Sequence, residues 1–386
     1  MTSGPLRIGL NLLYLVPGAG GAGTYARQLM PALLEVEPET ELTAFVTRRV
    51  PEAVLSEPWA EPVEWVRYEV EPASRRALFA QMVEVPLAAS KRGLDVVHSP
   101  ANIGLLTTRR AANVVSALDL IWLHRATSPL SRRERLGAKL VFSLCVRAAD
   151  RILTISEATK RDLVATIGLD PDRIDVTPLG VGATDRQATP EAELRRRFSL
   201  GDSPVLLCVA QKQPHKNLPS LIRALPEVDS ALLVLAGAAA PHERELKALA
   251  DELGVSARVR FLDWLSEPDL EGLYRTASGF VLPSFIEGFG LPVLEAMRFG
   301  TPVACSGRSA LLEVADDAAL LFDPTDQKAV TDAVRRLLLD ERLRQDLARR
   351  GLERSRQFTW RETAAATLAA YRTAIAAHRN RRLRES

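Results

Sequence analysis

The segment Leu282-Pro-Ser-Phe-Ile-Glu-Gly-Phe-Gly-Leu-Pro-Val-Leu-Glu-Ala-Met297 decides how the chain folds and where its chemistry lies. An apolar run at 279–282 ends at Pro283, a loop with Gly288 and Gly290 follows, and Pro292 stands where a first helical turn would begin. Proline is favoured at that position because its missing N–H would be an unused donor anyway. The segment therefore predicts a strand, a glycine loop and a helix whose free N-terminal amides can hold a phosphate.

Two carboxylates frame this predicted anion site: Glu287 lies in the loop and Glu295 lies one turn into the helix. Carboxylates suit phosphate poorly, but they accept hydrogen bonds from sugar hydroxyls. For either residue alone, the plain alternative is a solvated glutamate at the end of a strand–turn–helix. The whole string favours a site for a sugar next to a phosphate.

Short apolar runs alternate with helical patterns from one end of the chain to the other. This alternation is typical of parallel sheets covered by helices, here in two successive series. We therefore predict two Rossmann-like, doubly wound α/β domains facing a central crevice, with ligands outside the carboxyl ends of the strands. The predicted strands are 7–13, 42–47, 63–70, 94–98, 114–118 and 151–155, then 204–209, 231–236, 259–262, 279–282, 302–305 and 319–322.

A polar stretch at 184–190 marks the boundary between the two series. We predict a first domain at 1–185, a second at 186–358, and a final segment at 359–386 that consists of a helix and a basic tail. The helix is expected at 360–377, where Thr359 as N-cap and Glu362 three residues later form a capping box.

Composition narrows the class of protein. A chain of 386 residues is long for one domain, and a net charge of +2 gives no support for a general nucleic-acid binder. The cysteines Cys145, Cys208 and Cys305 are widely spaced, which fits core residues in a reducing compartment. No leader peptide or long apolar run is evident, so we expect a cytoplasmic protein.

The string from Glu287 to Val303 resembles the retaining glycosyltransferases of family GT4, the glycogen-synthase-like group of the GT-B fold that includes bacterial mannosyltransferases. Their hallmark is a pair of glutamates separated by seven residues, as Glu287 and Glu295 are. The resemblance implies that Glu287 contacts the transferred sugar and Glu295 binds the ribose. It also implies that backbone amides at Gly288, Phe289, Gly290 and Leu291 hold the diphosphate, and that the last helix crosses back onto the first domain.

The segment Val209-Ala-Gln-Lys-Gln-Pro-His-Lys-Asn217 resembles a second strand-end element of the family. There Lys216 would neutralise the leaving diphosphate, in a family that needs no metal or other cofactor. Many relatives place an arginine just after the strand, where this chain has Gln211 and Lys212, so Lys212 or His215 is the candidate second cation. A solvated lysine at a helix start is the plain alternative for Lys216.

The segment Pro17-Gly-Ala-Gly-Gly-Ala-Gly-Thr-Tyr25 follows the first predicted strand. A dinucleotide-binding loop is its obvious competitor, but that fingerprint needs an acidic residue at the end of the second strand. This chain has Thr47-Arg48-Arg49 there. The segment also resembles a glycine element of the family, in which Gly20, Gly21 and Gly23 lie against the donor phosphates and Tyr25 lies on the acceptor side. We expect the helix to begin at Thr24.

One departure from the family pattern concerns the acceptor side. Relatives commonly read His-Asp where this chain reads Leu118-Asp119, which leaves Asp119, His98 and His124 as candidate polar groups, with Asp119 as the catalytic one. The nucleotide base would lie near 261–265, at Leu265. Asp170-Pro-Asp172 imitates a metal motif, but it lies in a turn after a helix, so we predict no metal site.

The sequence thus predicts a hexosyltransferase whose donor is a nucleotide sugar, GDP-mannose before UDP-hexose, and whose acceptor is a hydroxyl compound. A glucosyl- or N-acetylglucosaminyltransferase acting on a small soluble acceptor is the alternative within enzymes. A nicotinamide-dependent oxidoreductase and an inactive sugar-nucleotide binder are the remote ones. Basic residues between 125 and 161 and at the C-terminus leave open a lipid-linked acceptor and a peripheral contact with the inner membrane face.

Overall fold

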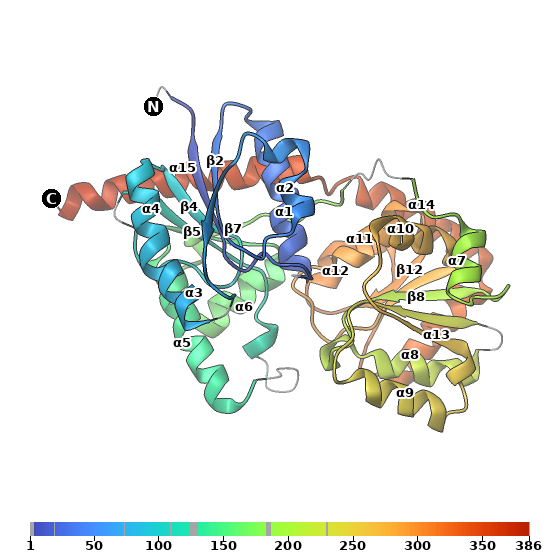
Figure 1. The fold of residues 1–386 in the computed structure, drawn as a ribbon. Coiled ribbons are helices and arrows are strands. Elements are labelled where there is room, and N and C mark those ends of the chain that lie inside the picture. Colours follow the sequence, from blue (N-terminus) through green and yellow to red (C-terminus); the bar gives the residue numbers. More distant parts are fainter. Residues whose placement is uncertain are drawn as a thin grey trace. The chain divides into compact units, whose positions relative to one another are not determined.

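The computed structural model describes residues 4–18, 20–72, 74–108, 110–123, 130–182, 187–228 and 231–385. The chain divides into two compact units, one of residues 1–180 with 359–386 and the other of residues 181–358. Figure 1 shows a sheet with helices in each unit. No described helix is long and apolar enough to cross a membrane.

Every strand pairing in the two sheets is parallel, which confirms the prediction of doubly wound α/β units. The first sheet has the order β3-β2-β1-β4-β5-β6-β7 and the second the order β10-β9-β8-β11-β12-β13. The strands are β1 (Arg7–Leu12), β2 (Glu41–Thr47), β3 (Glu64–Tyr68), β4 (Val96–Ser99), β5 (Ala112–Ala117), β6 (Arg151–Thr154), β7 (Ile174–Val176), β8 (Val205–Val209), β9 (Leu232–Ala236), β10 (Val259–Leu262), β11 (Gly279–Leu282), β12 (Val303–Ser306) and β13 (Leu320–Phe322).

The direction of winding reverses once in each sheet, between β1 and β4 in the first and between β8 and β11 in the second. At such a reversal the loops that follow the two neighbouring strands diverge to opposite faces and leave room for a ligand at the carboxyl ends. The Gly20 segment follows β1, while the Lys216 and Glu287 segments follow β8 and β11. The topology therefore brings the last two segments to one place in the second unit.

Helices cover both faces of each sheet. In the first unit α1 and α15 pack together on one face, and α3 to α6 lie on the other. In the second unit α8 packs with α9 and α13, and α11 packs with α10, α12 and α14. The helices are α1 (Gly20–Val36), α2 (Glu52–Leu55), α3 (Arg75–Phe79), α4 (Val85–Arg92), α5 (Arg132–Ala148), α6 (Glu157–Ile167), α7 (Glu191–Arg197), α8 (Leu218–Ala224), α9 (Glu243–Glu252), α10 (Glu267–Thr276), α11 (Leu291–Arg298), α12 (Ala310–Ala315), α13 (Gln327–Leu339), α14 (Glu341–Ser355) and α15 (Trp360–Glu385).

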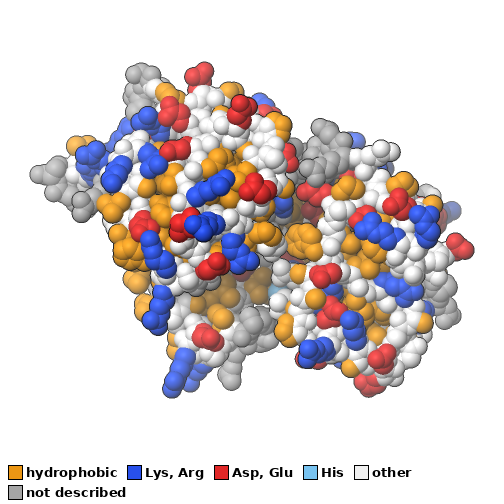
Figure 2. Space-filling view, viewed as in Figure 1, with side chains coloured by type: hydrophobic (Ala, Val, Ile, Leu, Met, Phe, Trp, Pro, Cys, Tyr) orange, Lys and Arg blue, Asp and Glu red, His pale blue; other side chains and the backbone are white. Residues whose placement is uncertain are grey.

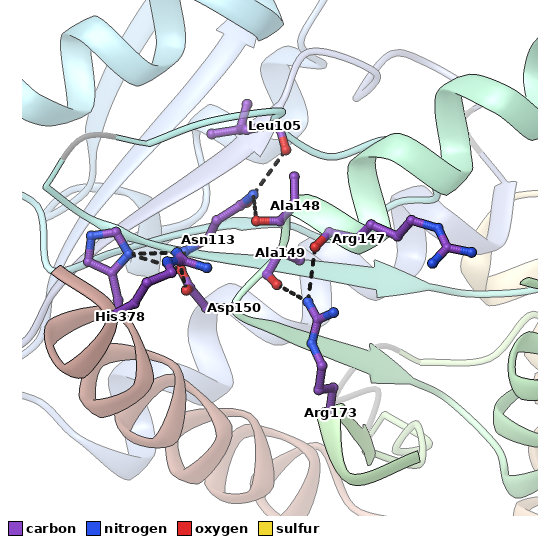
Figure 3. Close-up of polar contacts among 9 residues, drawn as sticks. Leu105, Asn113, Arg147, Ala148, Ala149, Asp150, Arg173 and His378 are labelled. Atoms are coloured by element: carbon purple, nitrogen blue, oxygen red, sulfur yellow. Dashed lines mark hydrogen bonds and ion pairs between the residues drawn. The ribbon is translucent and has the colours of Figure 1, made fainter. Parts of the chain in front are cut away.

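The final helix α15 is fastened to the first unit by a buried carboxylate. Asp150 accepts hydrogen bonds from the backbone N–H of Asn113 at 2.8 Å and from the Arg381 guanidinium at 2.5 Å, and His378 Nδ1 lies 3.2 Å away. Figure 3 shows His378 reaching from the helix to Asp150 beside the strand ends. As predicted, Thr359 caps the start of this helix by accepting the backbone N–H of Glu362 at 3.1 Å.

Candidate active site

Two loops meet at the reversal of the second sheet, and each contributes one charged side chain. Lys216 ends the short helix Pro214–Lys216 after β8, and Glu287 lies in the loop after β11. Lys216 Nζ lies 2.7 Å from Glu287 Oε1, and both side chains are largely buried, with 17% and 10% of their surface exposed. A backbone hydrogen bond from Phe285 N–H to the His215 carbonyl, at 2.9 Å, joins the same two loops.

Two serine hydroxyls hold Glu287 in place. Ser284 Oγ donates to Glu287 Oε1 at 2.7 Å, and the backbone N–H of Glu287 donates to Ser309 Oγ at 2.9 Å. Both contacts of the carboxylate with described residues, from Lys216 and from Ser284, end on Oε1. Oε2 is therefore the oxygen that remains for a ligand.

The start of α11 has the backbone geometry that its glycines and proline predict. Gly290 is the N-cap with φ 109°, and Pro292 lies in the first turn. A Cβ on Gly290 would come within 2.4 Å of Leu311, so a side chain here is excluded both by the left-handed φ and by the neighbour. In the first turn of this eight-residue helix Pro292 has no N–H and the Val293 N–H donates to the Gly290 carbonyl at 2.9 Å, so the Leu291 N–H and the positive end of the helix dipole make its start suitable for an anion.

Glu295 lies on α11, where Tyr274 of α10 donates a hydrogen bond to its Oε2 at 2.7 Å. Burial raises the pKa of Glu295, while the Tyr274 hydroxyl acts in the opposite direction and stabilises the charged form. Tyr274 itself is buried and packs against Phe299 and Phe280. The phenol thus fixes the direction of one carboxylate oxygen.

The structure contradicts the assignment of Lys212 as a second cation of the site. Its side chain is 1% exposed, and its ammonium donates to the carbonyls of Gly237 and Leu262 with Glu243 Oε2 3.5 Å away. These partners hold the turns at the ends of β9 and β10, so the charge is used inside the unit. Burial lowers the pKa of Lys212, which is the cost of desolvating the ammonium.

His215 does not replace that cation either. Burial and the neighbouring Lys216 lower the pKa of His215 to about 4, so the imidazole is neutral at physiological pH. Gln211 is exposed at the end of β8, and Leu265 is half-buried in the loop after β10. Lys216 is thus the cation that the structure places beside Glu287.

The glycine segment of the first unit begins a helix earlier than the sequence suggests. Helix α1 begins at Gly20 and not at Thr24, so Gly20, Gly21 and Gly23 lie in its first turns. Gly20 takes φ 61°, and a Cβ on Gly21 would meet nothing within 4 Å. Gly21 therefore offers bare, open backbone at a helix start, while Gly23 is buried.

The structure contradicts the placing of Tyr25 and His98 on the acceptor side, because neither side chain has exposed surface. His98 Nδ1 lies 2.7 Å from the Tyr371 hydroxyl and its Nε2 lies 2.7 Å from Ser116 Oγ, which in turn lies 3.2 Å from the Tyr25 hydroxyl. This buried chain joins α1, β4, β5 and α15. The two residues stabilise the core of the first unit and have no atom to offer to a substrate.

The remaining acceptor-side candidates are Asp119 and His124. Asp119 follows β5, is half-buried, and accepts the backbone N–H of Ile121 through Oδ1 at 3.1 Å. His124 lies outside the described residues. The Asp170-Pro-Asp172 segment is a turn, as the sequence suggests, because Asp170 accepts the Asp172 N–H at 2.9 Å.

Within the described ranges, no cluster of His, Cys, Asp and Glu is arranged to hold a metal ion.

Sequence reasoning missed Ser284, Ser309 and Tyr274. Ser284 directly follows the strand-ending Pro283 and could have been found by its place in the motif. Ser309 and Tyr274 lie 22 and 21 positions away from the glutamates that they contact, so only the fold brings them there. A hydroxyl on a buried helix face carries no sequence signal that separates it from a core residue.

Comparisons with known proteins agree on both halves of the chain. Residues 191–354 match the family model described as glycosyl transferases group 1, and residues 19–184 match the model described as glycosyltransferase family 4. The chain is 32% identical over 232 residues to O-antigen chain mannosyltransferase B of Escherichia coli, covering 58% of this chain and 61% of that protein. It is 30% identical to a D-inositol 3-phosphate glycosyltransferase of Salinispora tropica, covering 95% and 84%.

Two solved structures have the same fold. Sucrose-phosphate synthase from Thermosynechococcus elongatus superposes with a TM-score of 0.78 at 22% identity, covering 96% of this chain and 100% of that one. Anabaena HepE in complex with UDP and glucose gives a TM-score of 0.74 at 17% identity, covering 95% and 100%.

Proposed function

Because the chain belongs to the family 4 glycosyltransferases and has their GT-B fold, we propose that it transfers a hexose from a nucleotide sugar to a hydroxyl acceptor with retention of configuration. We further assign the donor to the second unit and the acceptor to the first. The observation that carries the proposal is the pairing of Lys216 with Glu287 beside the start of α11. These groups supply a cation, the positive end of a helix and a carboxylate oxygen at one reversal of the sheet.

The reaction that this arrangement supports breaks the bond between the anomeric carbon and the diphosphate oxygen, which keeps the electron pair. Lys216, the Leu291 N–H and the positive end of α11 stabilise the negative charge that grows on the departing diphosphate, and no metal ion is needed for that charge. The acceptor oxygen bonds to the anomeric carbon from the same face. The departing phosphate oxygen takes the proton of the acceptor hydroxyl, which makes a histidine at Leu118 dispensable.

The two glutamates bind different parts of the donor. Glu287, fixed through Oε1 by Lys216 and Ser284, offers Oε2 to a hydroxyl of the transferred hexose. Glu295, oriented by Tyr274, accepts from the ribose hydroxyls.

The best-supported donor is GDP-mannose, since a mannosyltransferase is among the relatives. A second candidate is a UDP-sugar with a small soluble acceptor. Relatives that match over most of this chain are named D-inositol 3-phosphate glycosyltransferase, and a protein of the same fold binds UDP-glucose.

A thermal-shift and turnover screen with GDP-mannose, UDP-glucose, UDP-N-acetylglucosamine and ADP-glucose tests the proposal. A donor should raise the melting temperature of the wild type, because it binds only the folded state. Glu295→Ala should lose this shift, and Lys216→Ala should keep binding but lose turnover. The controls are the exposed Glu245→Ala and Lys247→Ala on α9. Lys216→Ala with wild-type turnover, or no donor bound and NADH bound instead, would contradict the proposal.

The first unit also carries an apolar surface that supports a peripheral membrane contact. Nine of the fifteen exposed large apolar side chains of the described residues lie between positions 78 and 144, on a few helices and the loop 103–106. Figure 2 shows hydrophobic side chains interspersed with Lys and Arg over this part of the unit. The nine exposed apolar side chains between positions 78 and 144 are Leu78, Phe79, Val83, Leu87, Ile103, Leu106, Leu136, Leu140 and Leu144.

These side chains form one surface because the loop 103–106 joins the two groups of helices. Gln81 donates to the Ile103 carbonyl at 2.8 Å, and Cys145 of α5 donates to the Gly104 carbonyl at 3.2 Å. On α5, Leu136 and Leu140 share a stripe with exposures of 60% and 62%. That helix carries five Lys or Arg and one acidic residue. Apolar side chains flanked by cations fit an anionic lipid surface.

Flotation with phosphatidylglycerol vesicles and with phosphatidylcholine vesicles tests this contact. The wild type should float with the anionic vesicles, and the double variant Leu136→Ser/Leu140→Ser should not. Leu339→Ser, at a leucine of the second unit that is 74% exposed, is the control. Equal flotation of the wild type and the double variant would contradict the assignment.

A further inference from the structure

Helix α12 lies between two residues with unusual backbone conformations. Ser309 before it has φ 50° and ψ −140°, and Asp316 after it has φ 49° and ψ −128°. L-residues rarely adopt a positive φ, and glycine would take it without steric conflict. A six-residue helix held between two such residues is strained at both ends.

The two strained residues have different surroundings. Ser309 Oγ accepts the backbone N–H of Glu287 at 2.9 Å, whereas Asp316 is exposed and comes no closer than 4.0 Å to Arg354. Two residues on from Ser309, Leu311 packs where a Cβ of Gly290 would stand. The start of α12 therefore contacts both ends of the loop 287–290, at Glu287 and at Gly290. Among the described residues, the C-terminal end of α12 makes no contact with this loop.

We propose that Ser309 is a positioning residue for Glu287. Its positive φ places the Ser309 hydroxyl where it accepts the hydrogen bond of the Glu287 N–H. This inference rests on the proposed function, in which Glu287 Oε2 binds the transferred hexose. Glycine would satisfy the backbone at 309 without strain, but it could not accept the hydrogen bond. The N–H of the partly buried Glu287 would then lose its partner, and the loop could rotate its carboxylate away from the sugar.

Ser309 variants should affect the hexose end of the donor and not its nucleotide end. The ribose partner Glu295 is held by Tyr274 on a different helix. Loosening Glu287 leaves that contact unchanged. Ser309 variants should therefore change kcat with little change in the KM of the donor, because the lost interaction orients the sugar in the transition state.

Four variants of the full chain separate the hydroxyl from the backbone strain. Ser309→Gly removes the hydroxyl and relieves the strain, and Ser309→Ala removes the hydroxyl and keeps the strain. Ser309→Asn supplies another acceptor and keeps the strain, because ψ −140° lies outside the left-handed helical region that asparagine tolerates. Asp316→Gly relieves the same strain at the other end of α12, where nothing contacts Glu287.

We expect kcat to fall about five- to tenfold in both Ser309→Gly and Ser309→Ala, as for the loss of one hydrogen bond. The melting temperature should hold or rise in Ser309→Gly and in Asp316→Gly, and it should fall in Ser309→Ala. Ser309→Asn should recover part of kcat, and Asp316→Gly should turn over as the wild type does.

An active wild type with an equally active Ser309→Gly variant would overturn the role of Ser309 and leave the proposed function standing. Equal losses of kcat in Ser309→Gly and Asp316→Gly would also overturn it, because only the integrity of α12 would then matter. A wild type that turns over no donor would contradict the proposed function, and the role of Ser309 with it.

Discussion

The two carboxylates of the candidate site are each oriented by neighbouring side chains before any ligand binds. Glu287 takes its orientation from Lys216 and Ser284, and Glu295 takes its orientation from Tyr274. A carboxylate with one oxygen already bound has lost part of its freedom before the ligand arrives. Less entropy is then lost on binding, which is the benefit of a preorganised site.

Removal of the Tyr274 hydroxyl tests whether preorganisation of Glu295 strengthens ligand binding. Tyr274→Phe keeps the ring in its packing against Phe280 and Phe299 but removes the hydrogen bond that stabilises the charged carboxylate. The pKa of Glu295, already raised by burial, should rise further. The affinity for the nucleoside diphosphate should fall about tenfold, as expected for a hydrogen bond to a charged group, and the loss should grow as the pH falls.

Calorimetric titration with GDP and UDP between pH 6 and pH 8.5 measures that change. Tyr68→Phe on β3 of the first unit is the matched control, and it should bind as the wild type does. A Tyr274→Phe variant with wild-type affinity at every pH would show that the phenol is only a packing residue.

At the scale of single elements, the sequence predicts most strands and fewer of the helix boundaries. The apolar runs predict twelve of the strands to within a few residues, but β7 is three residues long and contains Asp175, so its pattern is too short to detect. Helix α1 begins within its glycines because packing of the following residues overrides their poor helix propensity. The motif residues Lys216 and Glu287 were predictable, whereas the burial of Lys212, Tyr25 and His98 depends on tertiary packing.

Helix α15 depends on Asp150 for its attachment. Asp150→Ala removes the acceptor shared by Asn113, His378 and Arg381, and it leaves buried donors without a partner. The free energy of unfolding should fall by about 3 kcal/mol, as when buried donors lose the acceptor that they share. Urea denaturation followed by circular dichroism measures it.

The matched control is Asp175→Ala, which removes a carboxylate that is 33% exposed in its pair with Arg151, whereas Asp150 is 1% exposed. It should cost about 1 kcal/mol, because water can reach the partners of this more exposed carboxylate and replace the lost contacts. If the two variants are equally stable, the buried network does not hold the helix.

At the scale of the whole molecule, the buried His98 should make the first unit sensitive to acid. Burial lowers the pKa of His98 to about 3, while the unfolded chain has the ordinary value of 6.5. Between these values the unfolded state binds the proton and the folded state does not, so stability is lost as the pH falls from 6.5 toward 3. His98 alone should cost about 2 kcal/mol between pH 7.5 and pH 5.

The difference between wild type and His98→Gln isolates this contribution from that of other titrating groups. The variant keeps a polar side chain between Ser116 and Tyr371 but cannot take up a proton. Unfolding curves at pH 7.5 and pH 5 should show a smaller loss of stability in the variant. Parallel losses in the two proteins would mean that His98 is not the sensitive group.

The chain leaves the first unit at Gly180 and re-enters it at Thr359, so the second unit is an insertion within the first. The two crossings run side by side, because the Val181 N–H donates to the Phe358 carbonyl at 3.0 Å and a Cβ on Gly180 would come within 2.1 Å of the Trp360 nitrogen. During synthesis the inserted unit is therefore complete while the surrounding one still lacks α15. Until that helix arrives, the apolar sides of α1, β4, β5 and β6 are uncovered, so the nascent first unit exposes surface on which incomplete chains can aggregate.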